Sequence, residues 1–160
     1  DLVAECRRIP TDELRRPELA AEAARLLAAV GRGDVAAELI EAALKEGWDT
    51  RLVALYGRID APPYRSRIEQ ASAWLAEHAS DPELLLALGL LCEREQLWGK
   101  ARGYLADSRR LRPSGETSLA LARIAEATGD EAAAREYFRE AALAFAHEHG
   151  GANGTGAAEH

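Results

Sequence analysis

The sequence predicts an all-α protein, a right-handed α-solenoid of about four helix-turn-helix repeats of tetratricopeptide (TPR) type. Three observations support this prediction. Ala, Leu, Glu and Arg, all strong helix formers, dominate the composition, whereas β-branched and aromatic residues are too sparse to furnish a sheet. Units of about 34 residues recur along the chain. Helix-capping residues and glycines fall where such units should begin and end their helices.

The unit that begins at Pro82 fills every position of the repeat pattern. That pattern has large apolar residues and a Leu-Gly pair in its first helix, small residues and one bulky residue in its second, and a closing proline. The residues at these positions are Leu85, Leu88, Gly89, Ala101, Leu105, Ser108 and Pro113. Because two helices approach closely only where side chains are small, we expect Gly89 and Ala101 to face each other.

Three further units fit the same phase. Their small and apolar positions are Ala24, Ala36, Ile40 and Ala43 in the first, Tyr56, Gly57, Ala71 and Leu75 in the second, and Leu121, Ala122, Ala134, Phe138 and Ala141 in the last. We therefore divide the chain into a remnant helix of a preceding repeat with a linker (1–16), a repeat array (17–148) and a disordered tail (149–160). The units span about residues 17–48, 50–81, 82–114 and 115–148.

Capping residues set the predicted helix bounds. Pro17 and Pro82 suit first helical positions. N-caps are expected at Asp34, Asp49, Asp81, Ser114 and Asp130, and helix ends at Gly31, Gly47 and Gly129. The expected helices cover residues 17–30, 34–46, 50–59, 66–78, 82–94, 97–110, 115–128 and 131–147.

The two ends of the chain give separate expectations. Leu2, Val3 and Cys6 have helical spacing and look like the trailing helix of an earlier unit. Because the chain opens with Asp1 and contains no Met, we expect a fragment or processed form of a longer array. Residues 150–156 are rich in glycine and have no apolar content to bury, which predicts the disordered tail.

Charge and cysteine usage argue against several classes of function. The 27 acidic residues exceed the 20 basic ones, and the net charge of −7 opposes binding to polyanions, so nucleic acid is not expected as a ligand. Cys6 and Cys92 lie far apart, which indicates neither a disulfide framework nor a zinc site. No apolar run approaches the roughly 18–20 residues that cross a bilayer.

Several segments carry a more specific resemblance than the generic repeat. They are residues 36–45, Gly47-Trp48-Asp49, residues 52–57, Trp74-Leu75, and residues 81–89 and 97–102. Together they resemble the C-terminal part of the HemY proteins of proteobacteria, TPR proteins encoded beside haem-synthesis genes and distinct from the protoporphyrinogen oxidase of that name. The resemblance covers about residues 1–148, although Cys6 stands near a point where the family tends to have an aromatic residue.

Membership of this family would have consequences for location and partners. It would imply two transmembrane helices upstream of the chain, association with the bacterial inner membrane with the repeats on the cytoplasmic side, and a role in a late stage of haem or porphyrin metabolism. The implied partners are proteins, with haem-pathway enzymes as candidates.

Motifs for chemistry are missing from the sequence. It contains no glycine-rich phosphate loop, HExxH or CxxCH motif, and His147 and His149 point in different directions on a helix. Cys92 occupies an inward packing position, which favours a buried thiol over a haem ligand. We therefore predict no catalytic, metal-binding or cofactor-binding residue, no cofactor, and no enzyme activity. Trp48, Trp74 and Trp98 are interpreted as hairpin packing or, alternatively, as surface recognition residues, with Trp48 the most exposed.

The candidate binding surface is the concave groove, which first-helix positions of successive units line together. The candidate residues there are Arg25, Arg58, Leu90, Arg94 and Arg123. Two hypotheses remain open for these arginines. They form an anion or acidic-peptide site through bidentate contacts, or nearby glutamates neutralise them in surface pairs. These glutamates are Glu18, Glu83, Glu93, Glu116 and Glu126.

The function predicted from the sequence is a protein-protein interaction scaffold, the soluble part of an inner-membrane protein of porphyrin metabolism. One alternative is a tetrapyrrole-binding carrier, whose ligand propionates would meet the arginines. The other is a generic TPR adaptor unrelated to haem. Binding of chaperone C-termini is disfavoured, because it needs Asn and Lys in the groove and the only Asn is Asn153.

Overall fold

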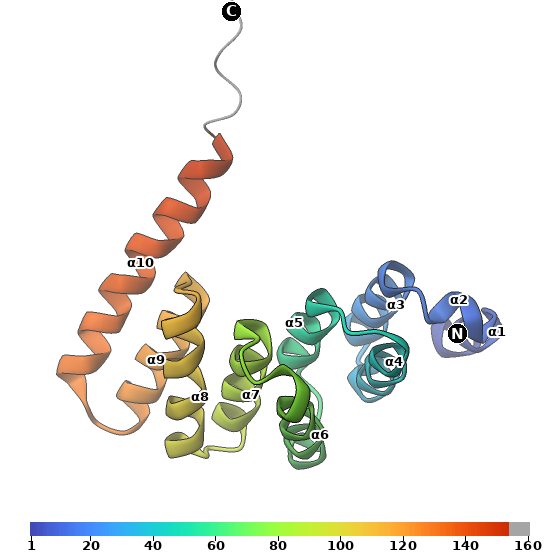
Figure 1. Ribbon diagram of the computed structural model, residues 1–160, viewed down its shortest axis with the longest axis horizontal. Coiled ribbons are helices and arrows are strands. Elements are labelled where there is room, and N and C mark those ends of the chain that lie inside the picture. The colour runs from blue at the N-terminus through green and yellow to red at the C-terminus, as the bar shows by residue number, and fades with distance from the viewer. Residues whose placement is uncertain (154–160) are drawn as a thin grey trace, which may run out of the picture.

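The computed structural model describes residues 1–153, and within this range the chain forms ten helices and no strand (Figure 1). Two short helices come first, α1 (Leu2–Arg8) and α2 (Thr11–Leu14). The eight longer helices are α3 (Pro17–Ala29), α4 (Gly33–Glu46), α5 (Thr50–Arg58), α6 (Tyr64–His78), α7 (Pro82–Arg94), α8 (Trp98–Leu111), α9 (Gly115–Ala127) and α10 (Glu131–Asn153). None of the helices in residues 1–153 combines the length and apolar content needed to cross a membrane.

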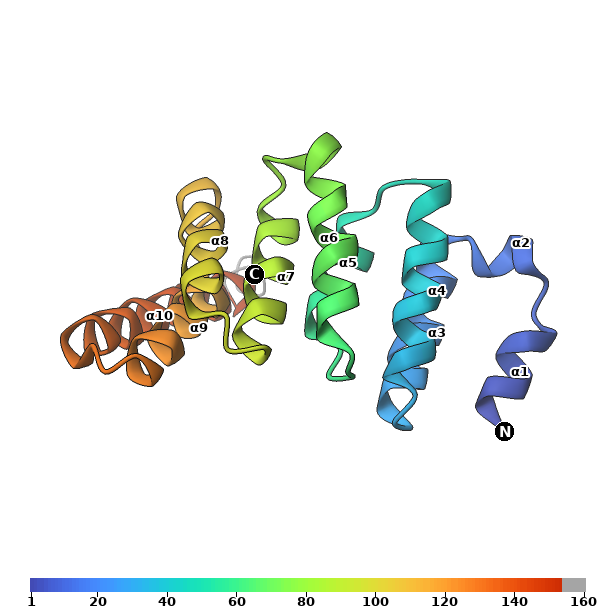
Figure 2. The ribbon, with the colours of Figure 1, turned by 90° about the horizontal axis from the view of Figure 1, so that it is seen from below.

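The longer helices form a stack of hairpins. The first helices of the hairpins are α3, α5, α7 and α9, and each is followed by a second helix that runs back beside it, across the axis of the stack. Figure 2 shows the second helices α4, α6 and α8 in succession along the solenoid. Each unit therefore has contacts mainly with its neighbours, and the core is a continuous strip between helices rather than a central globule.

Side chains cap the first helices much as the sequence predicts. Asp49 accepts a hydrogen bond from the amide of Arg51 at the start of α5, and Asp81 accepts from the amides of Glu83 and Leu84 at the start of α7. Ser114 accepts from the amide of Thr117 at the start of α9, and Asp130 accepts from that of Ala133 in α10. The prediction for Asp34 is wrong, because α4 already begins at Gly33 and the Asp34 carboxylate binds the Arg32 guanidinium instead.

Three units turn between their helices through a left-handed residue. Gly31 (φ 79°) and Gly129 (φ 78°) take this conformation after α3 and α9, as their glycine identity predicts. In the third unit, Gln96 takes the same conformation with φ 57°. Each turn is closed by the same kind of backbone hydrogen bond; in the third unit the amide of Leu97 donates to the carbonyl oxygen of Cys92 at 2.9 Å. Gln96, a residue with a side chain, therefore occupies a position that suits glycine.

Glycines in the first helices let neighbouring helices pack closely. Gly89 lies against the side chain of Leu105, since a Cβ at Gly89 would come within 2.6 Å of it, and the expected contact with Ala101 stays a prediction. Gly57 lies against the backbone of Ala87 in the following unit. Both glycines thus allow close packing, but one of them does so between units rather than within its own hairpin. Ala101 is fully buried in the core.

Both ends of the chain differ from the expectation. The predicted linker contains the additional short helix α2. At the other end, α10 continues through His149 to Asn153, so the prediction of a tail from residue 149 is wrong for residues 149–153. Helix extension adds one backbone hydrogen bond for each residue, which is enough to carry α10 past its last core contacts despite two glycines. The remainder of the predicted tail, residues 154–160, lies outside the described residues.

Candidate functional site

The first helices present one continuous polar face, which we call the first-helix face. It consists of the exposed side chains of α3, α5, α7 and α9 together with Arg112, which follows α8. Buried leucines such as Leu52, Leu84 and Leu121 fix the opposite sides of these helices in the core. Charged side chains therefore project from the first-helix face in a regular order set by the repeat.

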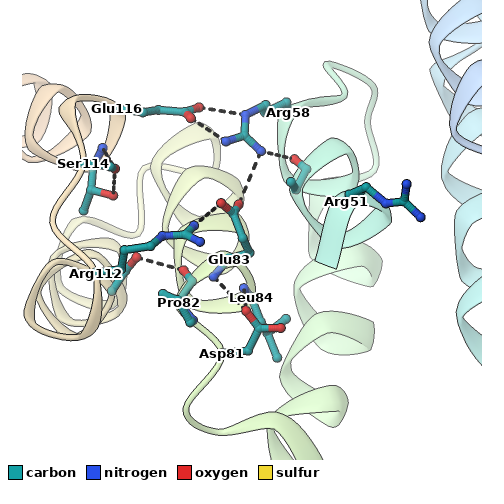
Figure 3. Close-up of polar contacts among 12 residues, drawn as sticks. Arg51, Arg58, Asp81, Pro82, Glu83, Leu84, Arg112, Ser114 and Glu116 are labelled. Carbon is teal, nitrogen blue, oxygen red and sulfur yellow. Dashed lines mark hydrogen bonds and ion pairs between the residues drawn. The ribbon is translucent and has the colours of Figure 1, made fainter. Parts of the chain in front are cut away.

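Arg58 is at the centre of this face, as Figure 3 shows. Its guanidinium makes a forked contact with Glu116 of α9, in which Nε donates to Oε1 at 2.9 Å and Nη2 to Oε2. Nη1 also lies 3.7 Å from Glu83 of α7, which accepts a hydrogen bond from Arg112. The side chains of α5 and α9 meet over the intervening α7, which identifies this face as the inner, concave side of the solenoid.

Two other predicted arginines are also paired with carboxylates. Arg123 of α9 binds Glu93 of α7 through two hydrogen bonds of 2.6 and 2.9 Å, and this carboxylate raises the pKa of Arg123. Arg94 lies 2.7 Å from Asp60 and 5.6 Å above the ring of Tyr64. These contacts join neighbouring units, so they stabilise the stack as well as neutralising the charge.

The remaining predicted residues are not part of this network. Arg25 projects from α3 into solvent, and within the described part of the chain its one ion-pair contact is a long one, 3.4 Å to Glu22 on its own helix. Leu90 is only 8 % exposed and belongs to the core, so its assignment to the groove is wrong. The helix there is buried on several sides, because α7 packs against α5, α6, α8 and α9. The five candidates therefore do not form one row of free cations.

Two participants on this face were not predicted from the sequence. Arg51 donates to Glu18 of α3 at 3.1 Å and also to Asp49, and its contact with Asp49 lowers the pKa of that carboxyl. Arg51, Glu83 and Glu116 occupy the same position of successive units, so the periodicity could have indicated Arg51. Arg112 lies beyond the end of α8 and outside the helical periodicity, and no repeat signal could have found it.

The described residues contain no group of three or more His, Cys, Asp or Glu side chains placed to hold a metal ion. Cys92 is fully buried, and burial raises the pKa of its thiol to about 11. A thiol in this state is a poor metal ligand and a poor nucleophile, because both functions need the thiolate. The chemistry that the first-helix face can supply is therefore recognition through paired charges.

Comparisons with known proteins show what fold this is. No family model matches the chain, and no curated protein matches it. A crystal structure of MamA aligns with a TM-score of 0.62 over 85 % of this chain and 82 % of its own, at 14 % identity. The MamA RS-1 ArsTM double mutant gives 0.61 over 92 % of both chains, at 17 % identity. At such low identity the likeness is one of fold, and it confirms the predicted all-α solenoid of TPR-like repeats.

Proposed function

We propose that this chain is a protein-protein interaction module that holds its partner along the first-helix face. The observation that supports the proposal best is the Arg58–Glu116 contact across α7, because it makes this face concave and connects three units into one surface. Solenoids bind extended partners on surfaces that stacked repeats assemble together. A face held by inter-unit ion pairs is ordered before a partner arrives, which reduces the entropic cost of binding.

The finer proposal concerns the cellular process. The resemblance of residues 1–148 to HemY proteins motivates the hypothesis that the module serves a late stage of porphyrin metabolism at the bacterial inner membrane, with the repeats in the cytoplasm. Its partners would then include haem-pathway enzymes. This proposal rests on the sequence motifs around Trp48, Trp74 and Trp98, and not on the structural likeness.

The structure weakens the argument for the tetrapyrrole carrier. That hypothesis needs free guanidinium groups to meet two propionates, whereas Arg58 and Arg123 each make forked contacts with a carboxylate. A propionate would have to displace Glu116 or Glu93, and each displacement leaves a glutamate without its partner. Protein partners, which can contact carboxylates and guanidinium groups together, suit this face better.

Site-specific photocrosslinking in cells tests the proposal. One variant carries a photoreactive phenylalanine in place of Glu22, beside Arg25 on the first-helix face, and the matched control carries it in place of Lys100 on α8. Both side chains are exposed, so neither substitution should affect folding. We expect a protein crosslinked from position 22 and not from position 100. Crosslinks from position 100 alone, or none from either, would reject the first-helix face.

The identity of the captured protein tests the finer proposal separately. An enzyme of porphyrin synthesis crosslinked at position 22 would support the haem-related function. A partner with no connection to porphyrins would reject it and leave a generic adaptor.

Reversing one ion pair provides a further control: Arg58→Glu should weaken stacking of the units, and addition of Glu116→Arg should restore it. If partner capture returns together with stability, these charges act by shaping the face; if it does not, the partner contacts them directly.

A further inference from the structure

A second recessed site lies on the side of the second helices, away from the first-helix face. It is a cavity of about 490 Å³, and its walls come from the C-terminal ends of α4 and α6 and from the connection between α4 and α5. Its lining includes the charged residues Lys45, Glu46 and Glu77 and the aromatic residues Trp48, Trp74 and His78. A volume of this size is in the range of small-ligand and side-chain pockets.

Aromatic rings form an ordered wall in this cavity. The rings of Trp48 and His78 are stacked, with centroids 3.7 Å apart and planes within 7° of parallel. Trp74 meets Trp48 edge to face at 5.7 Å and packs on Tyr56 at 5.0 Å. The indole N–H of Trp48 is already donated to Asp81 at 2.9 Å, which fixes the ring. Because His78 covers one face of this ring, its other face and its edges are left for other contacts.

The electrostatic surroundings favour a positive ligand. Both α4 and α6 end at this cavity, and the C-terminal end of a helix carries a partial negative charge from carbonyls without intrahelical partners. Glu46 and Glu77 add two carboxylates, against one ammonium from Lys45. Glu46 has a contact of 3.6 Å with Arg15, whereas Glu77 has no ion-pair partner among the described residues. Tryptophan faces bind cations, and guanidinium groups in particular combine ring stacking with carboxylate contacts.

We propose that this cavity binds a guanidinium group, the arginine side chain of a partner protein, between its tryptophan rings and Glu77. The site is independent of the first-helix face, so either proposal can fail without the other. A neutral planar ligand would use the rings but gain nothing from the helix ends and carboxylates. An anion would be repelled by the helix ends and by the two glutamates, which outnumber the single lysine of the lining, Lys45.

The test uses N-acetyl-arginine methylamide as the probe and the citrulline analogue, a neutral isostere, as its control. Binding is followed by the indole ¹H–¹⁵N NMR signals of Trp48 and Trp74, with the signal of Trp98, which does not line the cavity, as an internal reference. We expect saturable shifts of the first two signals with a dissociation constant on the order of 1–10 mM, as is ordinary for one side chain. The citrulline probe should produce at least about a tenfold weaker response, which corresponds to 1.4 kcal/mol or more.

Two substitutions at one exposed lining position give opposite expectations. Ala73→Lys places a cation in the cavity and should abolish binding, whereas Ala73→Glu should tighten it about threefold. Glu77→Gln should weaken binding about threefold or more, and Glu69→Gln, on the same helix but outside the cavity, should leave it unchanged. Absence of saturable shifts, equal binding of the citrulline probe, or indifference to the change at position 73 would each overturn the proposal.

Discussion

Among the described residues, Arg67 is the charged residue that the fold buries most completely, and it supports the second unit from within. Its side chain is only 4 % exposed, and none of its hydrogen bonds within the described part of the chain goes to a carboxylate. Instead, Nη1 donates to the carbonyl oxygens of Ile59 at 2.8 Å and Ala61 at 3.0 Å, and Nη2 donates to that of Tyr56. These carbonyls belong to the last turn of α5 and the loop after it, where a cation complements the helix dipole. Burial lowers the pKa of Arg67, which is the cost of this arrangement.

Replacement of Arg67 by methionine should therefore destabilise the protein strongly. Methionine keeps much of the apolar stem but removes all three hydrogen bonds. A hydrogen bond to a charged group contributes about 1.5–3 kcal/mol, and a buried carbonyl left without a donor costs about 1–3 kcal/mol. Relief of the buried charge offsets part of this loss. We expect a net loss of about 3 kcal/mol, which in a chain of this size lowers Tm by roughly 6–12 °C.

Urea and thermal denaturation measure this loss, and hydrogen exchange locates it. The amides of α5 and α6 should lose protection before those of α9 and α10, because the damage lies in the second unit. Arg65→Met is the matched control on the same helix, since the Arg65 side chain is 81 % exposed and its change should stay within about 0.5 kcal/mol. A loss below about 1 kcal/mol for Arg67→Met would refute the supporting role of its guanidinium.

Three further predictions follow from local chemistry. Gln96→Gly should stabilise the protein by about 0.5–1 kcal/mol in urea denaturation, because Gln96 has a positive φ; an unchanged midpoint would refute this. Alkylation of the native protein at pH 8, followed by mass spectrometry, should label the partly exposed Cys6 and spare the buried Cys92, whose pKa is raised to about 11. Arg109 holds the pKa of Glu140 below its ordinary value, so this stabilisation is full above about pH 4.5 and is lost as the pH falls through the lowered pKa. Glu140→Gln should accordingly reduce the pH dependence of Tm below about pH 4.5 and lower Tm at pH 7.

The helices were predictable because their signals are local. A proline at the first position or an Asp or Ser cap starts α5, α7 and α9, and glycine ends α3 and α9, so these bounds agree with the structure within one or two residues. The exceptions are residues whose conformation is set by the packing of the helices and not by their own residue type. Gln96 takes a left-handed conformation because the tight turn between α7 and α8 needs it, although nothing in its own identity indicates a turn.

The candidate site was less predictable because its contacts are long-range. Arg58 and Glu116 are 58 residues apart in sequence, and their meeting depends on the curvature of the whole stack. The sequence could place both residues on the first-helix face, but it left open whether the arginines would be free or neutralised. The structure resolves this for Arg58 and Arg123 in favour of neutralisation by Glu116 and Glu93.

This outcome has a physical cause in the stacking of the repeats. Stacking places a side chain of one repeat against a side chain of another, so a basic residue in one unit is opposed by an acidic residue in a different unit. Arg58 against Glu116 and Arg123 against Glu93 join different positions of the repeat, whereas Arg51 and Glu18 occupy the same position of neighbouring units. Arg25 lies on the first of these helices and has no such opposing glutamate from another unit among the described residues, which leaves it the most available cation of the predicted row. A partner that carries an acidic group should therefore engage this face at its α3 end, and Arg25→Glu should weaken its capture more than Arg58→Gln does.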